Sequence, residues 1–204
     1  MEGKKITVRI HLNEEMLGTS SANPDIHSEF IASKAPDAMS MEEEVAAIGA
    51  EAVEQKQMTV FPRDKDGCPI MWDYQVKGFM KDACGVLRKV PDSESGKIKA
   101  YKKEIDGLIF VEPRQIKLHL PQDGKITVCQ RPLRAQTAQG ERVALASSES
   151  VPAGTTLDVT FRMLTPKAHE KALMEWLDYG VLRGLGQWRN SGKGRFSYEV
   201  ISGQ

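Results

Sequence analysis

The sequence predicts an α+β fold in which helices cover one face of an antiparallel sheet. Three observations support this: an alternating strand pattern near the N-terminus, a series of short strand patterns in the second half, and a well-patterned helix that leads through a glycine-rich segment into a last strand. With 204 residues, 40% of them apolar, the chain is long enough for one or two domains with a buried core.

The first quarter of the chain combines one clear strand with an irregular segment. Residues 4–12 alternate apolar and polar side chains with a period of two, which is typical of a half-buried strand. Residues 13–40 are rich in Gly, Ser, Asn, Pro and Asp, and we expect an irregular insertion there. Ser40 and the acidic residues after it indicate a helix start, with the helix running to about Gln55. Residues 61–67 have the composition of a turn.

The middle of the chain contains one helix pattern and several strand patterns. Residues 73–89 place apolar side chains at i, i+4 spacing and predict a helix. Residues 90–104 are polar and charged, and we expect a mobile connector there. The strand patterns that follow, separated by turns with Pro, Gly or Asp, are 107–112, 115–120, 125–130, 142–146 and 156–164.

The last helix is the best supported element. Thr165 suits the N-cap position, Pro166 suits the first helical position, and the apolar stripe continues to about Leu182. A strand over 196–201 ends the pattern. The first strand together with this helix and strand are parts of a ferredoxin-like βαββαβ unit, and we expect a single domain over 1–204.

The net charge of zero is a cancellation between two parts of the chain. Residues 1–60 hold 5 Lys and Arg against 11 Asp and Glu, a balance of −6, and residues 61–204 hold 23 against 17, a balance of +6. No apolar run approaches the roughly 18 residues of a membrane span, and the N-terminus lacks a signal-peptide pattern. We therefore expect a cytoplasmic protein with no membrane partner.

The three cysteines fit neither a disulfide framework nor a zinc template. Cys68, Cys84 and Cys129 are odd in number and irregular in spacing, so we expect reduced thiols, with Cys84 and Cys129 in the core. No cluster of His, Asp or Glu has metal-ligand spacing, and no metal or cofactor is expected.

Residues 182–198, LRGLGQWRNSGKGRFSY, are the most informative segment. Its glycines let the backbone approach a ligand and present N–H groups to phosphate. The cations between 183 and 195 have no carboxylate among them. Its aromatic rings can stack on bases. The segment matches neither a Walker loop nor a dinucleotide fingerprint. Together with the basic stretch 125–142, the candidate ligand-binding residues are Arg183, Gly184, Gly186, Trp188, Arg189, Gly192, Lys193, Gly194, Arg195, Phe196, Arg131 and Arg134. The alternative is a solvated turn with Trp188 folded onto the core.

Among the four histidines, His27 has the most site-like neighbourhood, because it lies among Ser, Asn and Asp in the irregular insertion. It is the candidate catalytic residue, as a general base or a phosphate contact. His11 and His119 occupy strand positions and face either solvent or a sheet groove. His169 lies in the first turn of the last helix and is expected at the surface.

The glycine-rich segment resembles the glycine-rich loop of the RAMP superfamily, the ferredoxin-like (RRM-like) RNA-binding subunits of CRISPR effector and guide-processing complexes. The matching residues are Gly184, Gly186, Gly192, Gly194, Arg195 and Phe196. The N-terminal strand, Asn23–Pro24 and the glycine-bearing helix near 78–88 also look like shorter RAMP-like proteins of phages and prophages. The resemblance implies a RAMP-type fold and binding of RNA, a nucleotide or a CRISPR-type complex.

The preferred hypothesis is a non-catalytic protein that binds RNA, other single-stranded nucleic acid or a nucleotide through the glycine-rich segment. If the chain is encoded by a phage, it would act in nucleic-acid metabolism or against host defence, as a CRISPR-subunit mimic or by sequestering a nucleotide signal. One alternative is a metal-independent endoribonuclease, which the guide-processing RAMP proteins imply. The other is an interaction or self-assembling module, in which the acidic 1–60 region docks on a basic partner or on another copy.

Overall fold

The computed structural model describes residues 2–22, 58–137 and 140–203. The chain forms two compact units. The first unit comprises Met1–Met16, Pro62–Lys125 and Val151–Gln204, and the second comprises Leu17–Phe61 and Ile126–Ser150. The predicted helix from Ser40, the Asn23–Pro24 pair and His27 lie outside the described residues.

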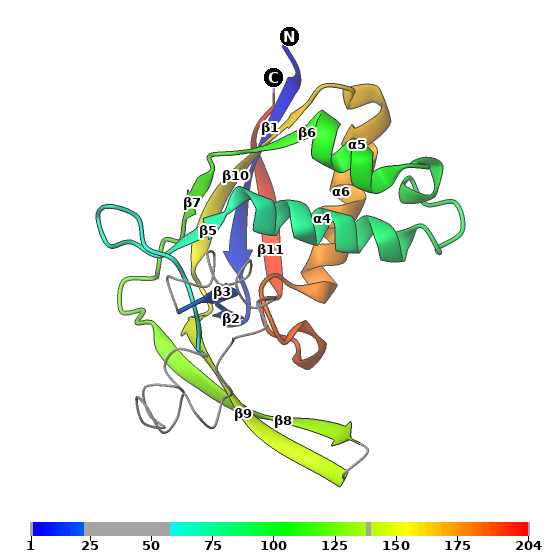
Figure 1. The fold of residues 1–204 in the computed structure, drawn as a ribbon. Coiled ribbons are helices and arrows are strands. Elements are labelled where there is room, and N and C mark those ends of the chain that lie inside the picture. The colour runs from blue at the N-terminus through cyan, green and yellow to red at the C-terminus, as the bar shows by residue number, and fades with distance from the viewer. Residues whose placement is uncertain (1, 23–57, 138–139, 204) are drawn as a thin grey trace, which may run out of the picture. The chain divides into compact units, whose positions relative to one another are not determined.

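The first unit contains a four-stranded antiparallel sheet with the strand order β11-β1-β10-β6 (Figure 1). Two helices connect its strands, and the chain order is β1 (Lys4–Leu12), α4 (Asp73–Leu87), β6 (Ile109–Glu112), β10 (Thr156–Met163), α6 (Pro166–Arg183) and β11 (Phe196–Gly203). This is the βαββαβ order of a ferredoxin-like unit, with the first and third strands adjacent at the centre of the sheet. The predicted α+β fold with an antiparallel sheet is confirmed.

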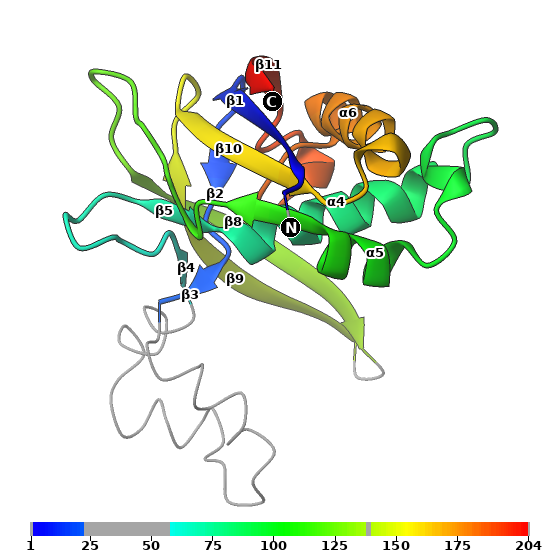
Figure 2. The ribbon, with the colours of Figure 1, turned by 90° about the horizontal axis from the view of Figure 1, so that it is seen from above.

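The alternation in β1 separates a buried face of the sheet from an open one. Ile6, Val8, Ile10 and Leu12 are buried, whereas the polar residues between them are partly exposed. β10 repeats the pattern with buried apolar residues from Leu157 onward. Figure 2 shows α4 and α6 together on one side of β1 and β10. The polar side chains of these strands therefore line the face that the helices leave open.

The two helices pack tightly where α6 approaches β11. The Phe79 and Phe196 rings meet edge to face with centroids 6.1 Å apart. A Cβ at Gly180 of α6 would lie 2.3 Å from Phe196 Cζ and 2.7 Å from Phe79 Cζ, so only glycine fits there. Trp176 is fully buried, and its indole N–H donates to Ser95 Oγ at 2.9 Å. These contacts fix the end of α6, from which the glycine-rich segment continues.

The segment predicted as a connector contains local structure that the sequence analysis missed. It includes the short 3₁₀ helix η1 (Ser95–Lys97), followed by α5 (Tyr101–Leu108), which leads directly into β6. Glu175 of α6 accepts hydrogen bonds from the backbone N–H groups of Glu94 and Ser95, both at 3.0 Å. The first unit also contains a small ribbon of β5 (Ile70–Trp72) and β7 (Gln115–Lys117).

The second unit is built around a long hairpin. Its strands are β8 (Thr127–Thr137) and β9 (Gly140–Val151), which pair antiparallel and extend well beyond the predicted strands 125–130 and 142–146. The sheet order is β2-β9-β4-β3, with β8 on β9, where the short strands are β2 (Met16–Leu17), β3 (Ser20–Ser21) and β4 (Thr59–Val60). Within the described part of the chain, no helix combines the length and apolar character needed to cross a membrane.

Candidate functional site

The glycine-rich loop, residues 184–195, connects α6 to β11 and folds back on itself. Gly184 and Gly194 both have left-handed backbone conformations, with φ of 80° and 72°. A Cβ at Gly184 would lie 2.5 Å from the Lys193 carbonyl oxygen, and one at Gly194 would lie 1.9 Å from the Leu185 carbonyl oxygen. These two glycines are therefore required by the close approach of the two limbs of the loop.

Backbone hydrogen bonds hold the loop in this shape and attach it to the segment after β1. The Leu185 N–H donates to the Gly194 carbonyl at 2.9 Å, and the Gly194 N–H donates to the Glu15 carbonyl at 2.8 Å. The Asn13 N–H donates to the Arg195 carbonyl at 2.8 Å. The Leu185 side chain is buried. The loop is thus a packed extension of the core.

Three of the four loop-region cations form ion pairs with carboxylates from distant segments. Arg189 Nη1 lies 2.8 Å from Asp82 Oδ2 of α4, and Arg183 Nε lies 3.7 Å from the same oxygen. Lys193 Nζ pairs with Glu15 Oε1. The segment 183–195 lacks a carboxylate in the sequence, but the fold supplies two. The two carboxylates therefore offset half of its four positive charges.

Trp188 and Arg195 are exposed residues of the loop, together with Asn190 and Ser191. Trp188 is 39% exposed and holds a left-handed backbone conformation, with φ of 54°, which is rare for a bulky residue. Lys193 Nζ lies 5.9 Å from the centre of the Trp188 ring. Arg195 is exposed and contacts no carboxylate within the described residues. The loop therefore exposes part of one aromatic side chain and one cation that pairs with no described carboxylate.

The remaining predicted ligand residues lie elsewhere. Phe196 is fully buried, so its ring packs in the core and is not available to stack on a ligand, contrary to the sequence analysis. Arg131 belongs to β8 of the second unit, where its side chain is buried and donates to Ser148 Oγ at 3.4 Å. Arg134 pairs with Val143 in the same hairpin, and its side chain lies outside the described set.

The histidines are placed differently from the sequence interpretation. His169 is 1% exposed, so the expectation of a surface residue is wrong. Its two ring nitrogens form hydrogen bonds with side chains of α5 and of the start of α6. His11 and His119 flank Thr156, which pairs with His11 of β1 and forms an isolated bridge with His119. His27, the candidate catalytic residue, lies outside the described residues. No group of three or more metal-binding side chains occurs in the described ranges.

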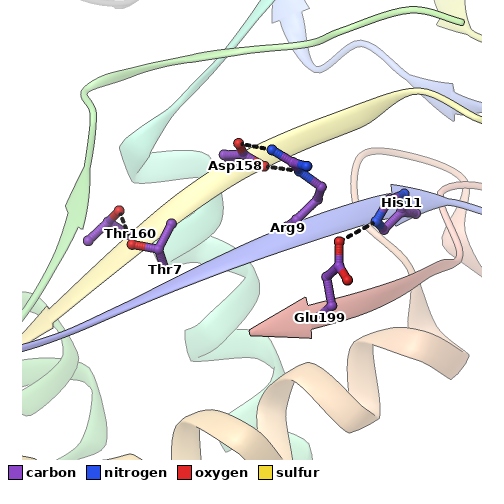
Figure 3. A network of polar contacts seen from close by, with 6 residues as sticks. All are labelled: Thr7, Arg9, His11, Asp158, Thr160 and Glu199. Carbon is purple, nitrogen blue, oxygen red and sulfur yellow. Dashed lines mark hydrogen bonds and ion pairs between the residues drawn. The ribbon is translucent and has the colours of Figure 1, made fainter. Parts of the chain in front are cut away.

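The open face of the sheet carries a polar network that sequence reasoning did not identify (Figure 3). Arg9 forms two hydrogen bonds to Asp158, both at 2.8 Å, and holds the pKa of this carboxyl below its usual value. Thr7 and Thr160 share a hydrogen bond at 2.9 Å. His11 Nε2 lies 3.3 Å from Glu199 Oε1. Because its cations are matched by carboxylates, this face is not a basic groove.

Comparison with known proteins identifies the fold. No protein-family model matches the chain, and no curated protein matches it. Among solved structures, a chain of the type III-B Cmr-beta complex bound to cognate target RNA matches with a TM-score of 0.57 and 11% identity. The match covers 100% of this chain and 60% of that chain, so the protein spans less than two thirds of that subunit. A chain of a type IV-B CRISPR complex matches with a TM-score of 0.49 and 13% identity, covering 97% of this chain and 90% of that one.

The first of these matches shows a likeness of fold. The predicted ferredoxin-like fold of RAMP type is confirmed by the first match and by the strand order of the first unit.

Proposed function

We propose that this protein binds single-stranded RNA through the exposed surface of the glycine-rich loop. The observation that carries the proposal is the presentation of Trp188, which is exposed from a left-handed backbone position in the same loop as the exposed Arg195. An exposed indole stacks on an unpaired base, and a guanidinium binds phosphate through its planar fork. The fold match to a chain of an RNA-bound complex supports RNA as the nucleic acid.

The arrangement favours an unpaired strand over a duplex, because only an unpaired base offers its face to an indole. It also predicts a small electrostatic contribution, since Arg183, Arg189 and Lys193 are engaged with carboxylates. Each phosphate contact on a single strand contributes a slope of about −0.7 to the dependence of log K on log salt. We therefore expect a shallow slope, in which Arg195 accounts for about one phosphate contact, or about −0.7.

Fluorescence anisotropy with a labelled single-stranded RNA tests the proposal. Trp188→Ala should weaken binding by about 5- to 150-fold, the range for loss of one stacked base. Arg195→Ala should weaken binding and make the salt slope shallower by about 0.7. Tyr74→Ala and Lys89→Ala are matched controls, because both side chains are exposed and belong to other segments. Unchanged affinity in the Trp188→Ala/Arg195→Ala double variant, or equal losses in the controls, would refute the assignment.

The same samples discriminate the two alternative functions. Cleavage of the RNA in the presence of a metal chelator, lost in His27→Ala, would favour a metal-independent endoribonuclease. Assembly that grows with protein concentration and dissolves in high salt without RNA would favour a self-assembling module. Co-purification with a CRISPR-type ribonucleoprotein would support a role as a subunit, or as a mimic if the chain is encoded by a phage.

A further inference from the structure

A chain of hydrogen bonds at the start of α6 links a hydroxyl, an imidazole and a carboxylate, the last of which belongs to α5. Thr165 Oγ1 is 2.7 Å from His169 Nδ1, and His169 Nε2 is 3.0 Å from Glu104 Oε2 of α5. The imidazole is 1% exposed, whereas Thr165 is an exposed residue. The cluster lies in the first unit, and neither the glycine-rich loop nor the open sheet face includes any of its members.

For an ionised carboxylate and a neutral imidazole, the chemistry of the three groups sets the direction of their hydrogen bonds. An ionised carboxylate only accepts, so Glu104 requires a proton on His169 Nε2. In the neutral imidazole, Nδ1 is then the acceptor, and the Thr165 hydroxyl donates to it. A nucleophile, a base and an orienting carboxylate follow one another in the same order in acyl-transfer enzymes, where Nε2 faces the nucleophile and Nδ1 the carboxylate, the reverse of the assignment of the two nitrogens here.

The threonine is also not in its usual role. Thr165 occupies the N-cap position of α6, yet its hydroxyl makes no capping hydrogen bond to the helix. Instead it is directed to the imidazole, which leaves the lone pairs of the oxygen available to an electrophile. An open groove of about 710 Å³ runs along α6 from Pro166 to Asp178, but neither Thr165 nor His169 lines it.

We propose that Thr165 is an activated nucleophile that accepts an acyl group from an activated ester. Thr165 Oγ1 bonds to the carbonyl carbon while its proton passes to His169 Nδ1. The bond from that carbon to the leaving oxygen then breaks, and the leaving oxygen takes up the proton. The product is an ester on Thr165, and no further reactant is needed. Glu104 is a positioning residue, because it acts through the imidazole and does not touch the reacting atoms.

The experiment uses p-nitrophenyl acetate on the full chain and follows both the p-nitrophenolate burst and the mass of the protein. We expect one acetyl group per chain, mapped by peptide mass spectrometry to Thr165. Thr165→Ala should abolish this labelling and Thr165→Ser should retain it. His169→Gln should slow the burst by about 10²- to 10⁴-fold, the usual contribution of a general base. Thr7→Ala is the matched control, because that hydroxyl bonds to Thr160 and to no imidazole.

Variants at the half-buried Glu104 keep the test valid even if the fully buried His169 is needed for folding. Glu104→Gln should slow the burst at least tenfold, and Glu104→Asp should restore part of the burst rate. The unfolding midpoints of these variants should not follow their burst rates. An equal burst in Thr165→Ala, acetylation only at lysines, or no burst in the parent protein would each overturn the proposal. Because RNA binding plays no part in this assay, its outcome is separate from that of the proposed function.

Discussion

Replacing Gly194 by alanine should destabilise the protein far more than the same change at Gly192. Both glycines lie in the glycine-rich loop and have similar left-handed conformations, with φ of 72° and 83°. Their surroundings differ: a Cβ at Gly194 would lie 1.9 Å from the Leu185 carbonyl oxygen, whereas one at Gly192 would meet only Arg195 side-chain atoms at 3.7 Å. The pair therefore separates backbone strain from packing between the limbs of the loop.

The expected difference follows from what must move. At either position a left-handed alanine costs about 1–2 kcal/mol, partly offset by about 0.4–1 kcal/mol from a less flexible unfolded chain. At Gly194 the limbs must also separate, which breaks the hydrogen bonds from Leu185 N–H to the Gly194 carbonyl and from Gly194 N–H to the Glu15 carbonyl. Each contributes about 0.5–1.5 kcal/mol, and exposing the buried Leu185 costs about 1.5–3 kcal/mol. We expect about 1 kcal/mol for Gly192→Ala and about 3 kcal/mol or more for Gly194→Ala.

Urea unfolding followed by tryptophan fluorescence measures both variants against the parent. A lower midpoint at unchanged slope is the expected signature of lost native-state stability. Equal destabilisation of the two variants would show that the limbs are not packed as described. In that case the glycines would serve backbone conformation alone, and the loop would no longer be a fixed platform for Trp188.

Three further predictions concern the core and the open sheet face. Glu175→Gln should lower the free energy of unfolding by about 1.5–3 kcal/mol, measured in urea, because its carboxylate accepts hydrogen bonds from the Ser95 N–H and hydroxyl. Gly180→Ala should be destabilising despite the better helix propensity of alanine, since overpacking costs about 1–3 kcal/mol; a thermal midpoint at or above that of the parent would contradict this. Arg9 lowers the pKa of Asp158 in the folded state, so this ion pair stabilises the fold at pH values above the unfolded-state pKa of the carboxyl, about 3.9. This stability is lost as the pH falls through the lower folded-state pKa. The parent should therefore lose more stability than Asp158→Asn as the pH falls below about 4, the unfolded-state pKa of the carboxyl.

The elements that the sequence predicted correctly are those with a clear periodicity. Residues 6–12 alternate strictly within β1, and the stripe after Pro166 forms α6. The local pattern sufficed there because each element buries one face against the same core. α5 was missed because it is an eight-residue helix within a polar stretch, where a single buried residue, Ile105, gives no repeating signal.

The candidate site was harder to predict, because its chemistry depends on partners far away in the sequence. Asp82 lies 107 residues from Arg189, and Glu15 lies 178 residues from Lys193. A count of charges within 183–195 could not include either carboxylate. Burial of Phe196 was open to prediction, since it begins a strand whose alternation places its side chain opposite to the exposed Ser197.

The ion pairs change what kind of ligand the loop is suited to. With all of its cations free, the loop would be a general phosphate-binding surface with a steep dependence on salt. With Arg183 and Arg189 on Asp82 and Lys193 on Glu15, those cations instead fix the loop to α4 and to the segment after β1. A fixed loop holds the Trp188 ring in place before a ligand arrives, which reduces the entropy lost on stacking. Binding should therefore depend more on an accessible base than on the number of phosphates. Mononucleotides and short single strands should then compete for the loop about equally well at equal concentrations of bases.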